Sequence, residues 1–244
     1  MRKFAPLALV LTLAVGMLFA AACGGGSSSN TTALLRVVNS VYDSFFAGGG
    51  YDVLVDTTSF ATALAYKSSS NYTSLTAGSH AVEVRNTGTS ADLLNQTISV
   101  AGGSSYTYVI AGAGASPQSL MLTDNTTAAT TGNIQFRIVN ATGAFGAMDV
   151  YVTEPGTDIF TVSANDANLG FGATGGYHTL AKGTYEIRIT KPGDKTVVYF
   201  DSGSIALTAD GAVVTFIIEG SGTNPGGFPL DFQQLTDVAG TSSS

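Results

Sequence analysis

Residues 71–84 (NYTSLTAGSHAVEV) and 176–189 (GYHTLAKGTYEIRI) are two versions of one pattern, and this pattern decides the fold. Each version carries a tyrosine, a leucine three positions later, then a glycine, and finally β-branched residues at every second position. Alternation with a period of two is typical of a half-buried strand, and glycine adopts backbone conformations closed to most residues. Each version is therefore predicted to form a strand, a glycine turn and a second strand.

The repeat continues on both sides of this stretch. Earlier in each unit, LLRVVN (34–39) matches IQFRIVN (134–140), and YDVLV (51–55) matches MDVYV (148–152). In the first pair Arg36 matches Arg137, and Asn39 and Asn140 are expected to close their strands by bonding their own backbone. Later strands are expected at 97–100, 106–110, 204–207 and 213–218, and each unit ends in the same LTD (122–124 and 235–237).

Strand signals at this spacing, with glycine turns and no helical period, predict an all-β protein. We expect two tandem immunoglobulin-like antiparallel β-sandwiches of about seven strands each. Parallel pairing is not expected, because the chain lacks long crossover connections. The short run at 90–94 is expected to be a loop with at most one helical turn.

The predicted organisation has six parts. They are a lipoprotein signal peptide (1–22), an acylated cysteine with a flexible tether (23–33), a first sandwich (34–124), a linker (125–132), a second sandwich (133–237) and a disordered tail (238–244). Each sandwich is long enough to bury a core of its own.

The chain is acidic and sparsely charged. It has 10 Lys and Arg against 17 Asp and Glu, and charged residues make up 11% of its 244 residues. A surface of this sign repels the phosphate backbone of nucleic acids and anionic lipids. Nucleic acid is therefore not an expected partner, and any membrane attachment must be covalent or hydrophobic.

Cys23, the single cysteine of the chain, indicates a covalent attachment. Arg2 and Lys3 precede an apolar run, and three alanines then lead directly into Cys23. This arrangement resembles the bacterial lipoprotein signal, whose cysteine is diacylated, with palmitate for example, and becomes the mature N-terminus. The alternative is a retained transmembrane anchor, because residues 4–22 are nearly long enough to span a bilayer. The lone cysteine followed by a Gly/Ser tether favours the lipoprotein.

The resemblance to a lipoprotein signal also indicates a cellular location. In two-membrane bacteria, glycine rather than aspartate after the cysteine favours the outer membrane, and Gly24 stands there. We therefore expect a cell-envelope protein anchored through lipid on Cys23, with its folded part extracellular. The tether GGGSSSNTT (24–32) would let that part tumble close to the membrane.

The ordered motifs of both units resemble a known family. The series RVVN, DVYV, LGFG, YHTLAKGTYEIR and LTD is similar to the bacterial domain of unknown function numbered four-three-nine-seven. The resemblance covers nearly all of residues 34–237 and implies exported β-sandwich modules, often lipoproteins, with no established reaction. Between the first two strands, where the family usually carries proline and aspartate, this chain has YDSFFAGGG (42–50) and TGAFGA (142–147).

That departing loop is the candidate ligand or interaction site, with Phe45, Phe46 and Tyr51 in the first unit and Phe145 in the second. Adjacent aromatic residues on a glycine hinge are suited to adhesion or to stacking on sugars. The alternative is that one phenylalanine caps the end of the core, and this interpretation is favoured, because exposed paired phenylalanines are uncommon.

Catalytic and metal chemistry have little support in the sequence. His80 and His178 do not match in the repeats, and neither has a second ligand at metal spacing or an acid nearby in sequence. Asp158 and the cluster of Asn165, Asp166 and Asn168 supply oxygen ligands without the order of a calcium loop, so a polar turn is favoured. No cofactor is expected.

Asp52 and Asp149 occupy equivalent positions in separate sandwiches and are interpreted as solubilising or edge-protecting charges. The leading hypothesis is a non-enzymatic surface lipoprotein whose two sandwiches act as a spacer or interaction module. The alternatives are a carbohydrate- or peptide-binding lipoprotein with a surface protein or glycan as partner, and an exported hydrolase.

Overall fold

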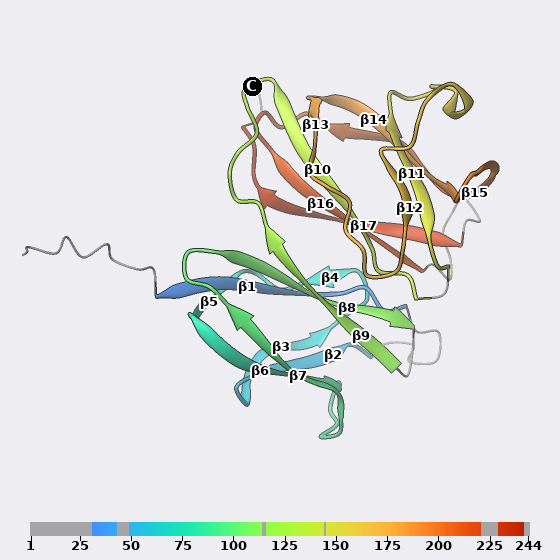
Figure 1. The fold of residues 1–244 in the computed structure, drawn as a ribbon. Helices are drawn as coiled ribbons and strands as arrows, with labels where there is room; N and C mark the ends of the chain where they lie inside the picture. The colour runs from blue at the N-terminus through green and yellow to red at the C-terminus, as the bar shows by residue number, and fades with distance from the viewer. Residues whose placement is uncertain (1–30, 43–48, 114–115, 144, 221–228, 242–244) are drawn as a thin grey trace, which may run out of the picture.

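The computed structural model describes residues 31–42, 49–113, 116–143, 145–220 and 229–241 (Figure 1). The predicted signal peptide, Cys23, Phe45 and Phe46 lie outside the described residues. No helix among the described residues has the length and apolar character needed to cross a membrane.

The described chain forms two β-sandwiches. In the first unit one sheet has the order β4/β5–β1–β8–β9 and the other has the order β3–β2–β6–β7. These strands are β1 (Thr32–Asn39), β2 (Tyr51–Val55), β3 (Thr58–Leu64), β4 (Ser68–Ser69), β5 (Thr73–Thr76), β6 (Gly78–Asn86), β7 (Asp92–Val100), β8 (Ser105–Ala113) and β9 (Ser116–Asp124).

The second unit repeats this plan. One sheet has the order β13–β10–β16–β17 and the other has the order β12–β11–β14–β15. Its elements are β10 (Asn133–Asn140), β11 (Met148–Thr153), the 3₁₀ turn η1 (Ile159–Thr161), β12 (Asp166–Leu169), β13 (His178–Ala181), β14 (Gly183–Lys191), β15 (Asp194–Leu207), β16 (Val213–Gly220) and β17 (Leu230–Val238). The predicted all-β sandwich fold is thus confirmed.

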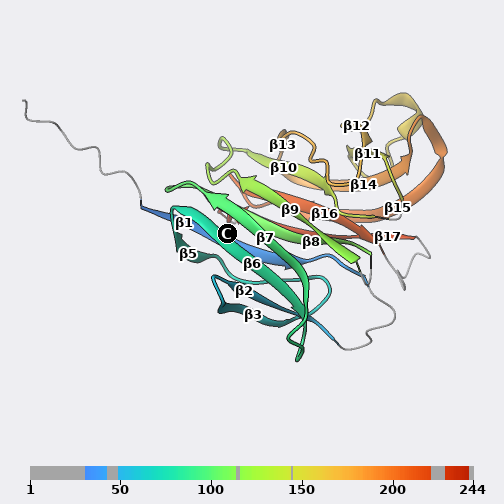
Figure 2. The same cartoon turned by 60° about the horizontal axis from the view of Figure 1, so that its bottom comes forward.

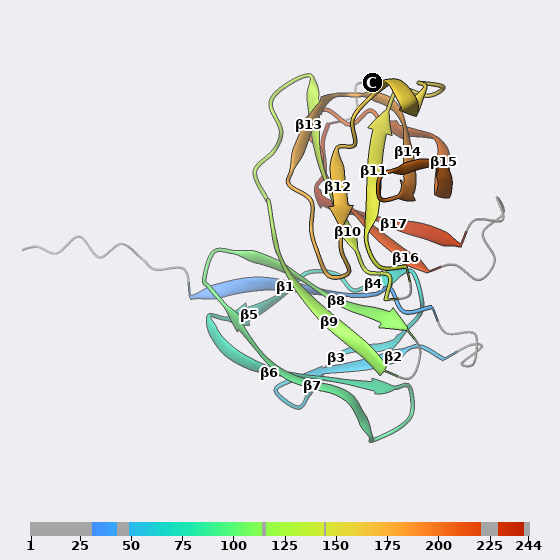
Figure 3. The ribbon, with the colours of Figure 1, turned by 45° about the vertical axis from the view of Figure 1, so that its right-hand side comes forward.

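The sheets of the two units stack in four layers (Figures 1 and 2). The sheet containing β1, β8 and β9 packs against the sheet containing β10, β16 and β17, through a shared apolar cluster. We call these two the inner sheets. The outer sheets, with β6 and β14, cover the remaining faces, so each unit also has its own apolar core between inner and outer sheet (Figure 3).

This layering explains two different strand patterns. The inner strand β1 is buried without interruption from Leu35 to Asn39, because it has a core on one face and the neighbouring unit on the other. The outer strand β2 alternates between buried and half-buried residues, because one of its faces meets solvent. As expected, the side chains of Asn39 and Asn140 accept from the backbone two residues on, at Val41 and Thr142 (3.0 Å each).

Among the described residues, each unit contains one parallel strand pair, contrary to the expected wholly antiparallel pairing. β1 pairs with β8 and β10 pairs with β16 in parallel. The long connection that a parallel pair requires runs mainly through the strands of the opposite sheet, together with β4 and β5 in the first unit and β13 in the second.

The repeated stretch is not a hairpin. β5 pairs with β1 in the inner sheet, whereas β6 pairs with β2 and β7 in the outer sheet. The chain therefore crosses from one sheet to the other at Gly78, whose φ of +143° is rarely open to residues with a side chain. β13 and β14 divide between the two sheets of the second unit in the same way.

The run at 90–94 was expected to be a loop, and this prediction is wrong from Asp92 onward. There β7 begins, with Arg85 of β6 opposite Asp92. The Arg85 Nε donates to Asp92 Oδ1 at 2.6 Å across the two strands, and cross-strand pairing outweighs the weak local preference.

Candidate functional site

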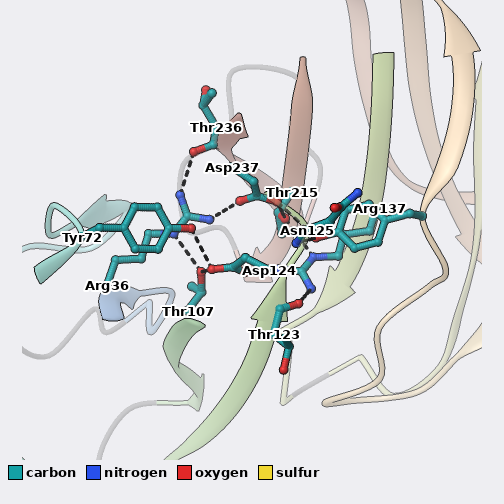
Figure 4. Close-up of polar contacts among 11 residues, drawn as sticks. Arg36, Tyr72, Thr107, Thr123, Asp124, Asn125, Arg137, Thr215, Thr236 and Asp237 are labelled. Atoms are coloured by element: carbon teal, nitrogen blue, oxygen red, sulfur yellow. Dashed lines mark hydrogen bonds and ion pairs between the residues drawn. The ribbon is translucent and has the colours of Figure 1, made fainter. Parts of the chain in front are cut away.

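The most elaborate polar arrangement of the described residues lies at the junction between the inner sheets (Figure 4). Arg36 in the middle of β1 points away from its own core and is only 4% exposed. Its Nε donates to Thr107 Oγ1 on β8 at 2.8 Å. The two terminal nitrogens cross to the second unit, where Nη1 donates to the carbonyl of Thr236 at 3.0 Å and Nη2 pairs with Asp237.

Arg137 on β10 repeats these contacts in the opposite direction. Its Nε donates to Thr215 Oγ1 on β16 at 2.9 Å. Nη1 donates to the carbonyl of Thr123 in the first unit at 2.8 Å, and Nη2 pairs with Asp124. Each unit therefore gives its arginine to the end of the last strand of the other, as across a two-fold axis.

The two carboxylates are held by equivalent hydroxyl groups. Asp124 Oδ2 accepts from Thr107 Oγ1 at 2.7 Å, and Asp237 Oδ2 accepts from Thr215 Oγ1 at 2.6 Å. The same threonine thus contacts the arginine of its own unit and the carboxylate that the other arginine binds. Burial is the main cause that raises the pKa of Asp237, while Thr215 and Arg36 favour its charged form.

Two tyrosines complete the arrangement. The guanidinium carbons of Arg36 and Arg137 lie 4.6 and 4.9 Å from the ring centres of Tyr72 and Tyr177. The Tyr72 hydroxyl donates to Asp124 at 2.7 Å, and the Tyr177 hydroxyl lies 3.3 Å from Asp237. We call the set Arg36, Tyr72, Thr107, Asp124, Arg137, Tyr177, Thr215 and Asp237 the crossed arginine network.

One end of the junction carries a second polar cluster. Glu219 on β16 is fully buried, with Oε1 4.0 Å from the Lys67 Nζ of the first unit. Lys67 also binds Asp231 at 2.7 Å, and the Tyr66 hydroxyl donates to the carbonyl of Gly220 at 2.6 Å. Burial raises the pKa of Glu219 to about 8, although the nearby Lys67 opposes this.

The β9 side of the junction has an apolar contact and a groove. There Phe171 and Leu120 pack against the shared apolar cluster. Beside them an open groove of about 510 Å³ runs between β9 and the second unit, and it is lined by Ser119, Leu120, Met121, Leu122 and Thr123 on one side and Arg137, Gly172 and Thr174 on the other.

The predicted interaction loop is only partly described. Of its four aromatic residues, Phe45 and Phe46 lie outside the described residues, as does Cys23. Tyr51 is a core residue with 6% of its surface exposed, which corrects its place in a ligand-facing loop. Phe145 is half-buried against the second core, with its ring centre 5.8 Å from that of Tyr199.

The fold brings both histidines to an acid, which sequence spacing did not reveal. His80 Nδ1 lies 2.6 Å from Asp56 Oδ2, and His80 Nε2 lies 2.8 Å from the carbonyl of Thr76. Two acceptors around one ring favour the doubly protonated form, and the Asp56 hydrogen bond raises the pKa of His80. Because both ring nitrogens are hydrogen-bonded, His80 joins Asp56 to the carbonyl of Thr76 and is not placed as a proton acceptor.

His178 is the first residue of β13. Its Nε2 lies 3.0 Å from Asp166 Oδ1, and its ring stacks on Phe136 with 5.2 Å between ring centres. No serine or threonine hydroxyl of the described residues is hydrogen-bonded to either histidine, so the described contacts assemble no nucleophile and base pair.

The equivalent aspartates anchor loops and are not merely solubilising charges. Asp52 accepts from the backbone nitrogens of Ala63 (2.8 Å) and Gly88 (3.1 Å), and these bonds lower its pKa. Asp149 is 7% exposed and accepts from Asn168 and Gly193 in the same manner (2.7 and 2.9 Å). This corrects their interpretation as edge charges.

Polar side chains around η1 accept hydrogen bonds from nearby backbone nitrogens. Asp158 accepts from the nitrogen of Phe160 at 2.9 Å, and Asn165 accepts from that of Val152 at 2.7 Å. Within the described ranges, no three His, Cys, Asp or Glu side chains are grouped in a way that would hold a metal ion.

Sequence reasoning therefore missed the junction. A signal was present, since each unit has an arginine inside an otherwise apolar strand and ends in LTD. A buried arginine needs an anionic partner, and the repeated aspartates are the matching groups. What the sequence does not show is that each arginine pairs with the aspartate of the other unit.

Comparison with known proteins agrees with the motifs. Residues 33–151 match the model of a domain of unknown function, DUF4397. This match supports the DUF4397 family for the first unit. It runs past β9 into β10 and β11, so it also takes in the first strands of the second unit.

Solved structures resemble the chain only weakly. The Bacillus anthracis TIE protein is 11% identical with a TM-score of 0.25, and the alignment covers 84% of this chain and 44% of that one. A leucine-rich repeat protein from Bacteroides thetaiotaomicron is 15% identical with a TM-score of 0.21, covering 76% of this chain and 26% of that one. The chain thus spans less than half the length of either. None of the curated proteins matches it.

Proposed function

We propose that this chain is a non-enzymatic, lipid-anchored cell-envelope protein whose two DUF4397-like sandwiches act together as one spacer and interaction module. The observation that carries this proposal is the crossed arginine network. It commits one buried arginine and one aspartate of each unit to holding the two units together.

A second copy of the same domain in residues 133–237 is part of this proposal. Its support is that both units have equivalent sheet orders, an equivalent parallel pair and an equivalent crossing between sheets at a glycine, Gly78 or Gly183. The equivalent roles of Arg36 and Arg137 add residue-level support.

The anchor is tested by fractionation of cells that produce the wild type, Cys23→Ser or the control Ser27→Ala. We expect a diacylated N-terminal Cys23 in the outer-membrane fraction for the wild type and for the control. The Cys23→Ser chain should leave the membrane fraction. A chain that retains residues 1–22 and stays in the membrane without acylation would overturn the lipid anchor.

A peptide-binding role is the second candidate, and the groove between β9 and the second unit favours it. The face of each inner sheet that points away from its own core is already buried in the junction. A partner therefore has to use an edge, a loop or an outer sheet.

A further inference from the structure

The strand β9 is an edge strand, because β8 is its neighbour on one side and the sheet ends there. The pairing of β8 shows which backbone groups of β9 face outward. The Ile110 carbonyl accepts from Ser40 at 2.9 Å, so Ile110 points its backbone groups toward β1. The backbone N–H and C=O groups of successive residues in a strand point to opposite sides. Those of Val109 therefore point toward β9, where Val109 faces Leu120. The backbone groups of Met121 therefore point away from β8.

Two further observations agree with this direction. The carbonyl of Thr123, two residues after Met121, accepts from Arg137 of the second unit at 2.8 Å. Pro117 has no N–H and stands four residues before Met121, at a position that the same alternation turns outward. Proline is tolerated in a strand where its nitrogen faces away from the neighbouring strand.

The outward edge from Ser119 to Thr123 borders the groove of about 510 Å³. Five residues of strand extend over about 17 Å. The opposite wall is Gly172, Thr174 and the side of Arg137, all from the second unit. Within the described part of the chain, no other element bonds to the outward backbone groups of Met121.

After Pro117, the edge from Ser119 to Thr123 lacks the usual protection against pairing. Lysine and other charged residues often stand on exposed edges to prevent strand addition. The stretch 119–123 (SLMLT) has no charge and no proline. Met121 is 37% exposed, and the Arg137 guanidinium in the groove is neutralised by Asp124.

We propose that an extended polypeptide segment of another protein adds as a strand to the outward edge of β9, in the groove between the two units. This proposal rests on the interaction-module function and names its partner class. Main-chain hydrogen bonds to Ser119 and Met121 supply the affinity, as in other cases of strand addition. The groove favours small, uncharged side chains on the side that faces Gly172 and Thr174.

A second copy of this chain is not the occupant. The second unit forms one wall of the groove, so pairing of two β9 strands would bring the second unit of each copy against the other. A single extended segment has no such bulk.

The test uses the full chain purified from membranes in detergent and a phage-displayed library of random heptapeptides. Peptides are selected on the wild type and measured on Met121→Pro and Met121→Ala. Met121→Pro removes the outward N–H, as Pro117 already does nearby, and leaves the bonds of the neighbouring residues to β8. Met121→Ala shortens the side chain and keeps the N–H.

We expect selected peptides to bind the wild type and Met121→Ala alike, and to bind Met121→Pro at least about tenfold more weakly, since a backbone bond and the close approach of the strand are both lost. Bound peptide should slow hydrogen exchange at the amides of Ser119 and Met121. If Met121→Pro fails to fold, this exchange measurement on the wild type decides the matter.

No enriched peptide, equal binding to Met121→Pro, or unchanged exchange at these amides would overturn the strand-addition site. Such a result leaves the anchor and the junction intact, because Cys23 acylation and the crossed arginine network are measured separately. Loss of the anchor in the fractionation experiment would overturn the proposed function without affecting peptide binding in detergent.

Discussion

At the scale of single residues, Arg36 and Asp237 carry charge into the buried junction, with 5% and 0% of their side chains exposed. Removal of one partner leaves the other charge buried and uncompensated. We expect Arg36→Ala to lower the free energy of unfolding by about 3–5 kcal/mol, and the double change with Asp237→Ala to cost clearly less than the sum of the two single changes. Urea unfolding at pH 7 measures this cycle, and simple additivity would show that the pair is not coupled.

Glu219 makes the free energy of unfolding depend on pH. Its pKa is about 8 in the folded protein and near the ordinary 4.5 when unfolded, so the folded state binds more protons between these values. The free energy of unfolding therefore falls as pH rises from about 4.5 to about 8, by an amount on the order of a few kcal/mol.

Glu219→Gln should remove this part of the pH dependence and make the protein more stable than the wild type at pH 8–9. Both proteins keep His80 and Asp237, so the difference between their pH profiles isolates Glu219. Parallel profiles in thermal unfolding from pH 5 to pH 9 would show that Glu219 is not neutral in the folded state.

At the scale of elements, Gly78 and Gly183 occupy equivalent places where the chain passes from an inner to an outer sheet. Gly78 has a φ of +143°, and a Cβ built there would meet nothing within 4 Å. Gly183 lies outside the positive range, and its Cβ would make an ordinary 3.5 Å contact with Tyr185.

We therefore expect Gly78→Ala to destabilise by about 1–3 kcal/mol through backbone strain alone. The matched control Gly183→Ala should cost well below 1 kcal/mol. Chemical denaturation of both variants checks this difference, and equal losses would contradict the strain argument.

The same elements show how far the sequence leads. Alternating apolar residues and paired glycines correctly predicted the strands around Val82 and Ile187 and the all-β class. They could not identify the neighbour of each strand, because alternation records which face is buried and not which strand lies alongside. The sheet crossing at Gly78, the parallel pairing of β1 with β8 and the strand starting at Asp92 were missed for this reason.

At the scale of the whole molecule, the same limit applies to the junction. Arg36 and the terminal LTD repeats were visible in the sequence, but the groups that Arg36 binds, Thr236 and Asp237 of the second LTD, lie 200 and 201 residues further along the chain. Only the packing of one inner sheet on the other brings them together. The shared apolar cluster and the two crossed ion pairs then make the stability of each unit depend on the other.

Differential scanning calorimetry of the wild type and of the double variant Arg36→Ala with Arg137→Ala tests this dependence most directly. We predict a single cooperative transition for the wild type and two separate transitions for the double variant, because the variant loses both crossed ion pairs while each core stays intact. Two transitions in the wild type, or a single transition retained in the double variant, would contradict the claim that the crossed arginine network joins the two sandwiches into one unit.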